Sequence, residues 1–437
     1  MELVYGNMMG IRWKDMPTRA SPHQDEVDVQ QRKPTPVFAS LFVLMLLAAG
    51  CAGESNDGAE STRVTIDTIG GVTYVRSSGE PPTWATQELL TLGTIASGDE
   101  ASAEEFGRIV SVIADADGAI YVADASSSDI RVFDERGALV RRMGRSGAGP
   151  AEFSVLQSIG WLGDTLVTLD GGNARIGLLT REGQWLGQRP SSRLTGTGLY
   201  LHQTAPDELF ALDFKPGAGG GRVYVRHDMT AVRDTMAAPH DPARSPSGIR
   251  CDHVSGGAIS FWSVDFSPRL LRQPAPNGER LDIYSSEYRL HFIARSGDTA
   301  RVITRDIPPA AIPDDLWDTE LARFQAWKDS LPPVNCQPRT LERPATMDLI
   351  RGVFFDDAQR IWVELRAREG SVFDVFEPDG RLAGQVSTPK RVETVPLHVR
   401  GDRIYLVTRD SMDVPFVKVL RYVRNEGQEQ VLGRNRK

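Results

Sequence analysis

Arginine and tryptophan residues lie near the starts of the repeated units into which this 437-residue sequence divides. Both residue types dominate the hot spots of binding surfaces. The candidates for a shared contact surface are Arg108, Trp161, Trp262, Arg351 and Trp362. If the units surround a common axis, we expect these side chains at its mouth, in contact with a ligand or a partner protein. The alternative, and the commoner role of an aromatic ring at such a position, is packing between neighbouring units.

Aspartate follows the second strand of three units, at Asp124, Asp170 and Asp213. Three carboxylates on one face could ligate a divalent cation, but an aspartate that caps its own turn explains the recurrence more simply. Seven histidines are present, and His202, His227, His240 and His253 fall in the third and fourth units. No pair of them has a metal-ligand spacing such as H-x-x-x-H. We therefore predict no resident metal ion.

The loop 144–150 (GRSGAGP) is rich in glycine, as loops that bind phosphate groups are. It lacks the Lys-Ser/Thr ending of a phosphate-binding loop and does not open a helix, so we interpret it as a linker between units. Ser146 does not fit a nucleophile elbow, because Ala148 stands where the G-x-S-x-G motif needs its last glycine. No serine hydrolase triad is expected.

The units themselves emerge from an internal repeat. Residues 120–124 align without gaps with residues 166–170, and the same offset pairs Gly137 with Gly183. Each unit consists of short apolar strands separated by polar turns. Six such units start near residues 109, 155, 198, 257, 348 and 393. A period of about 40 to 50 residues with several strands per unit predicts an all-β fold, a six-bladed β-propeller.

Two segments do not follow this repeat of strands and turns. Alternating apolar residues over 63–75 predict a strand that adds an outer strand to a blade or covers the last blade, so that no sheet edge stays open. Between the fourth and fifth units, apolar residues recur at helical spacing from Trp317 to Phe324, behind two aspartates. They predict a short helical insertion at about 314–331 on the propeller surface.

The first 50 residues predict where in the cell the protein is located. An apolar run of about 13 residues follows a basic pair and ends in small residues before Cys51, which is too short to span a bilayer and typical of a cleavable signal peptide. This ending resembles the lipobox of bacterial lipoproteins, which implies lipidation of Cys51 and cleavage after Gly50. Because Ala52 is not aspartate, the resemblance also implies a cell-envelope location on the outer membrane, facing the periplasm or the exterior.

The position of this signal peptide divides the rest of the chain into three segments. The polar residues 1–29 form an unusual leader upstream of it, which we interpret as a misassigned start of translation. Residues 51–61 contain too little apolar surface to order themselves and predict a flexible tether. Residues 62–437 are then the propeller domain, and the lipid on Cys51 is its expected contact with the membrane.

Residues 106–153 resemble an NHL repeat, most clearly in 119–124 and in the run 144–153. More broadly, the mature chain is similar to the six-bladed β-propeller lipoproteins related to NHL proteins. The resemblance is strong over the first unit, fair over the second and carried by strand spacing over the other four. It implies fold and location more than activity, because such propellers include binding proteins and enzymes. The Glu, Asn and Asp set of gluconolactonase-like enzymes has no residue-by-residue match here.

The net charge excludes one class of partner, and the cysteine count predicts one covalent bond. The chain carries 50 Lys+Arg against 58 Asp+Glu, a net charge of −8, and shows no basic stripe, so no nucleic-acid partner is expected. If Cys51 is lipidated, Cys251 and Cys336 remain as a pair in an oxidising compartment, where a disulfide is permitted. The bond would tie the 314–331 insertion to the loop around Arg250 as a braced cap over one propeller face. Two free thiols are the alternative.

Two functions remain open from the sequence. The first is a lipid-anchored propeller that binds a protein, peptide or glycan without chemistry or cofactor. The second is a metal-dependent propeller enzyme, a lactonase, another hydrolase or a lyase, with one divalent cation in the central channel. We favour the binding module because no constellation of catalytic residue types is visible, although propeller sites assemble from residues far apart in sequence.

Overall fold

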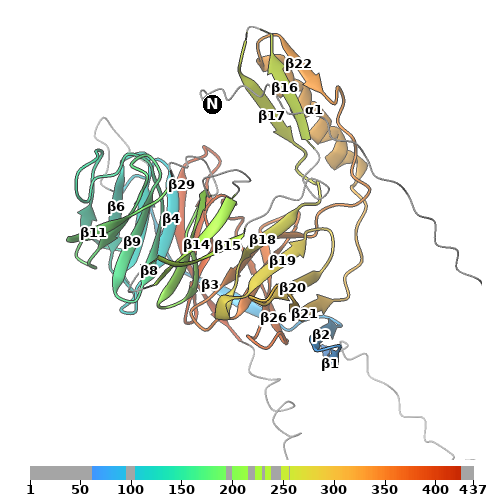
Figure 1. Ribbon diagram of the computed structural model, residues 1–437, viewed down its shortest axis with the longest axis horizontal. Coiled ribbons are helices and arrows are strands. Elements are labelled where there is room, and N and C mark those ends of the chain that lie inside the picture. Colours follow the sequence, from blue (N-terminus) through green and yellow to red (C-terminus); the bar gives the residue numbers. More distant parts are fainter. Residues whose placement is uncertain are drawn as a thin grey trace, which may run out of the picture.

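The computed structural model describes residues 62–94, 104–192, 199–214, 222–228, 232–237, 248–254 and 256–424. Over these residues the chain forms six four-stranded blades arranged as a β-propeller, with one separate lobe (Figure 1). The predicted all-β, six-bladed fold is confirmed. The predicted signal peptide, Cys51 and the tether lie outside the described residues.

Each blade runs outward from the central channel in strand order. Blade one contains β4 (Ile109–Ala114), β5 (Ile120–Asp124), β6 (Asp129–Phe133) and β7 (Leu139–Met143). Blade two contains β8 (Leu156–Leu162), β9 (Thr165–Asp170), β10 (Arg175–Leu179) and β11 (Trp185–Pro190). Blade three contains β12 (His202–Ala205), β13 (Glu208–Phe214), β14 (Arg222–Asp228) and β15 (Val232–Ala237).

The second half of the ring repeats this order. Blade four contains β18 (Leu270–Pro274), β19 (Arg280–Tyr284), β20 (Arg289–Ile293) and β21 (Thr299–Arg305). Blade five contains β23 (Ile350–Phe355), β24 (Ile361–Leu365), β25 (Ser371–Phe376) and β26 (Leu382–Thr388). Blade six contains β27 (His398–Arg400), β28 (Arg403–Arg409), β29 (Pro415–Val423) and, from the other end of the chain, β3 (Thr83–Leu92).

The second strand of a blade is buried on both faces because the blade is packed between two neighbours. All five residues of β5 are buried, and its first four residues, IYVA, are accordingly a continuous apolar run rather than an alternation. Between blades six and one, Phe133, Tyr405 and Val417 belong to one buried cluster. Blade-to-blade contact of this kind, repeated around the ring, forms the core.

The strand β3 closes the ring. It pairs antiparallel with β29, with Leu92 opposite Val417, and Trp84 stacks on Tyr422 with ring centroids 5.4 Å apart. It also forms a short parallel pair with β26, which joins blades five and six into one sheet. The sequence did not identify this strand, because residues 83–92 are mostly exposed on the outer rim and lack a regular apolar alternation.

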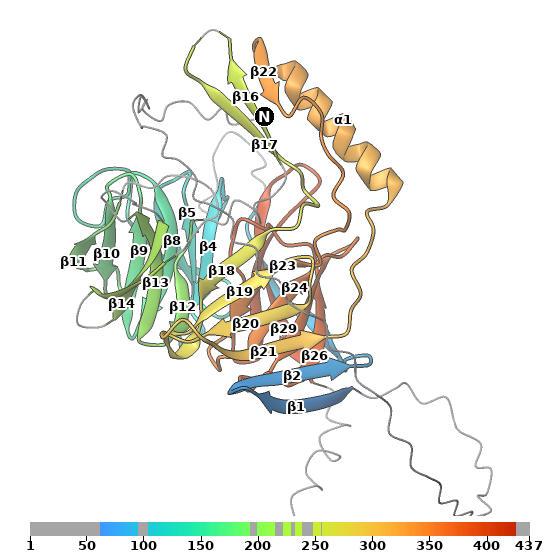
Figure 2. The same ribbon diagram turned by 45° about the vertical axis from the view of Figure 1, so that its right-hand side comes forward.

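The predicted N-terminal strand divides into β1 (Arg63–Ile69) and β2 (Val72–Ser78). Parallel pairing of β2 with β21 adds both strands to the outer edge of blade four, as the blue strands of Figure 2 show. The expectation of an added outer strand is therefore correct, whereas the alternative that this segment covers the last blade is wrong, because β3 occupies that place.

The lobe consists of β16 (Gly248–His253), β17 (Ile259–Ser263), β22 (Val334–Gln337) and α1 (Asp314–Ser330). The helix lies where the sequence predicts it, with Asp314 and Asp315 in its first turn, where they complement the helix dipole. The fourth unit, however, begins with β18 at Leu270 and not near 257. The strand-like residues near 257 belong instead to the β16–β17 hairpin, which precedes blade four.

Both arms of the lobe are connections between successive blades, from β15 to β18 and from β21 to β23. Such connections all lie at one end of the blades, and Figure 1 shows the lobe raised above that end. We call this end the lobe face. The opposite end, where the first strand of each blade turns into the second, is called the turn face. Among the described residues no helix has the length and apolar composition needed to cross a membrane.

Candidate functional site

Charged side chains from three connections meet at the lobe-face end of the channel, which we call the mouth. Two arginines of blade five, Arg351 and Arg366, share the same two carboxylates. Arg366 Nε lies 2.5 Å from an oxygen of Asp348 and its Nη1 lies 3.2 Å from Asp265. Arg351 Nη1 lies 3.3 Å from Asp348 and 3.5 Å from Asp265, and Nη2 contacts Glu393.

This sharing fixes the charges at the mouth. Burial alone would raise the pKa of Asp265, but the guanidinium groups of Arg366 and Arg351 outweigh it and hold that pKa below its ordinary value. Burial alone would lower the pKa of Arg351, but the carboxylates of Glu393 and Asp265 outweigh it and raise that pKa. Both groups therefore remain ionised at neutral pH, which suits recognition of charge better than exchange of protons.

A second buried ion pair supports the mouth from the side of blade six. Arg391 and Glu364 are only 4% and 5% exposed, and Arg391 Nε lies 2.9 Å from a Glu364 oxygen. Arg391 Nη1 also donates to the Val395 carbonyl at 2.7 Å, so the guanidinium joins the connection before β27 to blade five. The pair is bidentate and mostly desolvated, the geometry in which removal of one partner costs most.

Arg269 differs from its neighbours at the mouth. Its Nη2 donates to the Arg351 backbone carbonyl at 3.2 Å, and among the described residues no carboxylate forms an ion pair with it. Its Nε is buried without a hydrogen-bond partner in the described part of the chain. Burial and the nearby charge of Arg351 lower the pKa of Arg269. Arg269 is thus the cation at the mouth with hydrogen-bonding capacity left for an anionic group.

The structure does not bring the five candidates from the sequence together. Arg351 lies at the mouth, and Arg108 is exposed on the same face, just before β4. Trp161 is buried between blades one and two and donates to the Ala114 carbonyl at 3.0 Å. Trp362 is 0% exposed and donates to Asp356 at 2.9 Å. Both tryptophans therefore pack between blades, the alternative stated above, because their strands lie inside the ring.

Trp262 lies in the lobe rather than near the channel. Its indole N–H donates to Glu320 of α1 at 3.0 Å, and its ring packs against Phe324 and Trp327 with centroids 5.9 Å and 5.1 Å away. The sequence placed it at the mouth because residues near 257 were assigned to blade four. Its position in the lobe follows from the later start of that blade.

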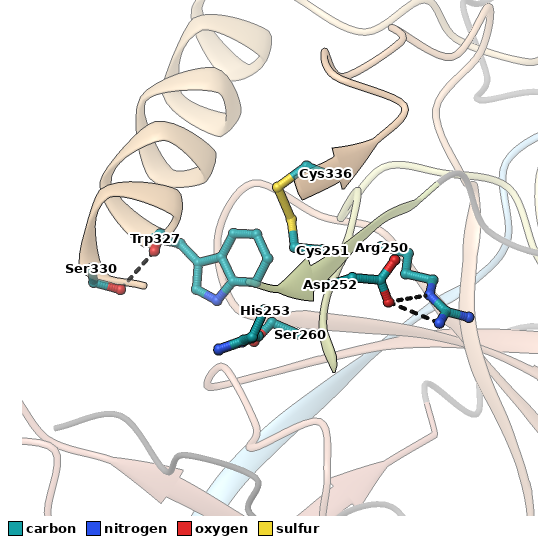
Figure 3. The surroundings of a disulfide bond; sticks show 8 residues. All are labelled: Arg250, Cys251, Asp252, His253, Ser260, Trp327, Ser330 and Cys336. Atoms are coloured by element: carbon teal, nitrogen blue, oxygen red, sulfur yellow. Dashed lines mark hydrogen bonds and ion pairs between the residues drawn. A yellow bond between two sulfur atoms is a disulfide. The ribbon is translucent and has the colours of Figure 1, made fainter. Parts of the chain in front are cut away.

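A disulfide joins the two arms of the lobe. Cys251 of β16 and Cys336 of β22 are direct partners in an antiparallel pair, and their sulfur atoms are 2.04 Å apart (Figure 3). The disulfide packs against Phe324 of α1, in one buried cluster. In Figure 3, His253 and Ser260 lie next to each other, with His253 Nε2 2.8 Å from the serine oxygen. The structure thus braces the hairpin to the insertion.

The three recurring aspartates hold the chain that enters their own blade. Asp124 accepts hydrogen bonds from the backbone N–H groups of Gly107 and Arg108, each at 2.9 Å. Asp170 accepts in the same way from Val155 at 3.0 Å, and Asp213 accepts from Ser192 at 3.0 Å. Asp124 also accepts from Ser126 in its own turn, at 2.9 Å. Their role in these contacts is structural.

The glycine-rich loop 144–150 does surround a carboxylate, which belongs to the chain itself. Gly149 N–H donates to Glu152 Oε2 at 2.8 Å, and Arg145 donates to Oε1 at 2.8 Å. The hydrogen bonds from Gly149 and Arg145 lower the pKa of Glu152. The loop connects β7 to β8, as predicted for a linker between units.

The channel below the mouth contains a cavity of about 270 Å³ lined by the first strands of all six blades. Two histidines line it, His202 from β12 and His398 from β27, on opposite sides of the ring. Burial lowers the pKa of His202 to about 4 and that of His398 to about 3, so both imidazoles are neutral at physiological pH. The sequence offered no signal for this pair, because the two residues lie in different blades.

Of the other histidine candidates, His227 and His253 do not line this cavity. His227 is buried in blade three beside Arg189, and His240 lies outside the described residues. Within the described ranges, no group of three His, Cys, Asp or Glu side chains is placed to hold a metal ion. The mouth residues Asp265, Asp348 and Arg366 were also missed by sequence reasoning, since they become neighbours only when blades four and five pack together.

Comparison with known proteins supports the fold. A family model described as a 6-bladed β-propeller matches residues 102–169, and no curated protein matches the chain. Among solved structures, a Bacteroides fragilis protein described as exported is 10% identical, covering 78% of this chain and 95% of its own, with a TM-score of 0.42. A catalytically inactive virginiamycin B lyase from Staphylococcus aureus is 9% identical, covering 83% and 100%, with a TM-score of 0.33.

Proposed function

We propose that this protein is a lipid-anchored propeller of the cell envelope that binds a protein, peptide or glycan partner through the mouth. The observation that carries this proposal is the guanidinium of Arg269, held by burial beside two arginines whose carboxylate partners are already in place. A site built in this way is positioned before the partner arrives, which reduces the cost of ordering on binding.

The chemistry of the mouth favours an acidic group on the partner. Charge-assisted hydrogen bonds from guanidinium to carboxylate or phosphate are strong and directional. Asp265 and Glu393 remain partly exposed at 39% and 49%, so the rim also carries negative charge that would select against a strongly acidic surface. The expected contact is therefore one anionic group surrounded by polar or basic atoms.

The anchor and location rest on the sequence. The apolar run before Cys51 and the small residues that precede it support lipidation at Cys51, and Ala52 in place of aspartate supports an outer-membrane location. Replacement of Cys51 by serine tests this directly. We expect the protein to move from the membrane fraction to the soluble fraction of the cell envelope, and a variant that stays with the membrane would contradict the anchor.

Site-specific photocrosslinking in intact cells tests the mouth. A photoreactive amino acid is placed at Arg108 on the lobe face and, as a control, at Arg136, which is exposed in a turn on the opposite face. We expect a discrete adduct from position 108 only, and its loss when Arg269→Gln is combined with that probe. An adduct that Arg269→Gln leaves unchanged would contradict the role of the mouth.

The enzyme alternative makes a different prediction. Elemental analysis of the protein purified without chelator should find about one equivalent of calcium, zinc or manganese that survives dialysis if a divalent cation occupies the channel. That result would replace the binding module with a metal-dependent enzyme and direct a screen of lactones and esters.

A further inference from the structure

The cavity in the channel extends away from the mouth to the turn face. Besides the first strands of the blades, its lining includes Pro206, Asp357 and Gln359, which lie in the turns that follow first strands. Its volume of about 270 Å³ lies just below the range of pockets that hold drug-sized ligands. The space accordingly suits a small molecule rather than a peptide.

His398 lines this cavity and has a ring nitrogen without a partner. Nε2 is buried without a hydrogen-bond partner in the described part of the chain, and the ring lies near the Ala114 carbonyl. A neutral imidazole has one N–H donor and one lone pair, so its nitrogens can donate or accept according to the tautomer. A buried nitrogen of this kind costs free energy unless a partner reaches it.

Arg400 and Asp357 provide a donor and an acceptor at the rim. Within the described ranges, no hydrogen bond or ion pair ends on the Arg400 guanidinium, although Arg400 lines the cavity two residues after His398 on the same strand. Asp357 is exposed and accepts the Gly401 N–H at 3.2 Å with each oxygen. The two charges balance one another, so the rim favours a neutral ligand over an anion.

The other walls supply a polar group and apolar surface. His202 has ring contacts with Tyr200 and Tyr224, with centroids 4.7 Å and 5.1 Å away, and no hydrogen bond within the part of the chain described. Apolar side chains such as Phe354 and Leu201 complete the lining. A ligand that fits must carry several groups that both donate and accept, on a compact body with apolar faces.

We propose that the turn-face end of the channel binds a neutral polyhydroxylated molecule of about one sugar ring, with hydroxyl groups placed between His398, Arg400 and Asp357. A hydroxyl group donates one hydrogen bond and accepts two, so the same ligand can satisfy the imidazole nitrogen in either tautomer, the guanidinium and the carboxylate. The C–H faces of a sugar ring pack against the apolar walls. This site lies at the opposite end of the channel from the mouth and does not depend on the proposed function.

Calorimetric titration of the full-length protein in detergent tests the proposal. The probes are glucose, galactose, mannose and N-acetylglucosamine, with gluconate and galacturonate as anionic counterparts, each up to about 20 mM. Arg400→Gln removes the unpaired charge, and His398→Asn keeps a donor near Nδ1 while removing Nε2. Arg136→Gln, an exposed arginine on the same face, is the matched control.

We expect at least one neutral sugar to bind, with about tenfold or greater loss of affinity in Arg400→Gln and in His398→Asn and none in Arg136→Gln or Arg269→Gln. Binding of the acids without the neutral sugars would overturn the assignment of a neutral ligand. Sugar binding that survives Arg400→Gln would overturn the channel as its site. Absence of binding by every probe would overturn the proposal as a whole, and the photocrosslinking result at the mouth would stand separately.

Discussion

Except for Arg269, the charged groups at the mouth satisfy one another, whereas Arg400 and His398 at the turn face do not. At the mouth, Arg351 and Arg366 share two carboxylates, and Arg391 holds Glu364 in a buried pair. At the turn face, Arg400 has no partner among the described residues and His398 Nε2 is buried without one. Where groups satisfy one another, their removal should cost stability. Where they do not, their removal should cost binding and leave the fold intact.

The largest effect is expected at the buried pair of the mouth. Arg391→Met leaves the Glu364 carboxylate desolvated without its partner, and we expect the free energy of unfolding to fall by about 3–5 kcal/mol. Chemical denaturation measures this change. The double variant Arg391→Met with Glu364→Leu should recover most of it, because neither charge then remains buried. A loss below about 1 kcal/mol in the single variant would break the contrast between the two ends.

The disulfide provides the next largest effect and confines it to the lobe. Cys251 and Cys336 are 85 residues apart, with all of blade four between them. Replacing both with serine should lower the stability of the lobe by about 2–4 kcal/mol, because the open chain gains conformational entropy. Hydrogen exchange should show faster exchange in β16 and β22 and no change at β27. Mass spectrometry of the unreduced protein supplies the control, and two alkylatable thiols there would remove the basis of the prediction.

The pH dependence of stability tests whether His398 is buried in its neutral form. Burial lowers the pKa of His398 from 6.5 to about 3, so between these values the unfolded chain binds a proton that the folded protein does not. Stability therefore falls as pH falls below 6.5. Between pH 6.5 and 5 we expect His398→Asn to show about 1–2 kcal/mol less loss than the wild type. Denaturation curves at the two pH values give the comparison, and parallel losses would show that His398 is not buried in its neutral form.

The smallest effect is expected at Arg400. Because its guanidinium has no partner within the described ranges, Arg400→Gln should change the free energy of unfolding by less than about 0.5 kcal/mol. The same denaturation series that includes Arg391→Met measures it. A loss as large as that of Arg391→Met would mean that Arg400 is a structural residue and would remove the distinction drawn between the two ends.

The regular blades could be predicted from sequence because local pattern and tertiary environment agree there. In blades one and two, the aligned segments 120–124 and 166–170 are buried second strands, and Asp124 and Asp170 hold equivalent backbone N–H groups. The helix α1 was predictable for the same reason, since Trp317 and Phe324 lie on the face it buries, although Leu321 of the same apolar set is exposed. In such segments the local sequence pattern alone predicts the structure.

The mouth and the start of blade four could not be predicted in this way. Arg366 and Asp265 form an ion pair across 101 residues, and no spacing within a unit records that proximity. The β16–β17 hairpin carries the same strand pattern as a blade, so residues near 257 were assigned to the ring rather than to the lobe. Trp262 was misplaced for this reason alone. Contacts between blades are decided by the closed ring, which a repeat pattern does not encode.

The pairing of β3 with β29 has a consequence for the order of folding. Glu88 and Lys418 form an ion pair across 330 residues, so the last blade cannot be completed until nearly the whole chain has been synthesised. Until then β3 has no antiparallel partner, and the contacts that close the ring are among the slowest to form because of their separation in sequence. A chain shortened before residue 415 would leave both β3 and β28 with open edges. Quality-control proteases should therefore remove truncated products and spare the complete protein.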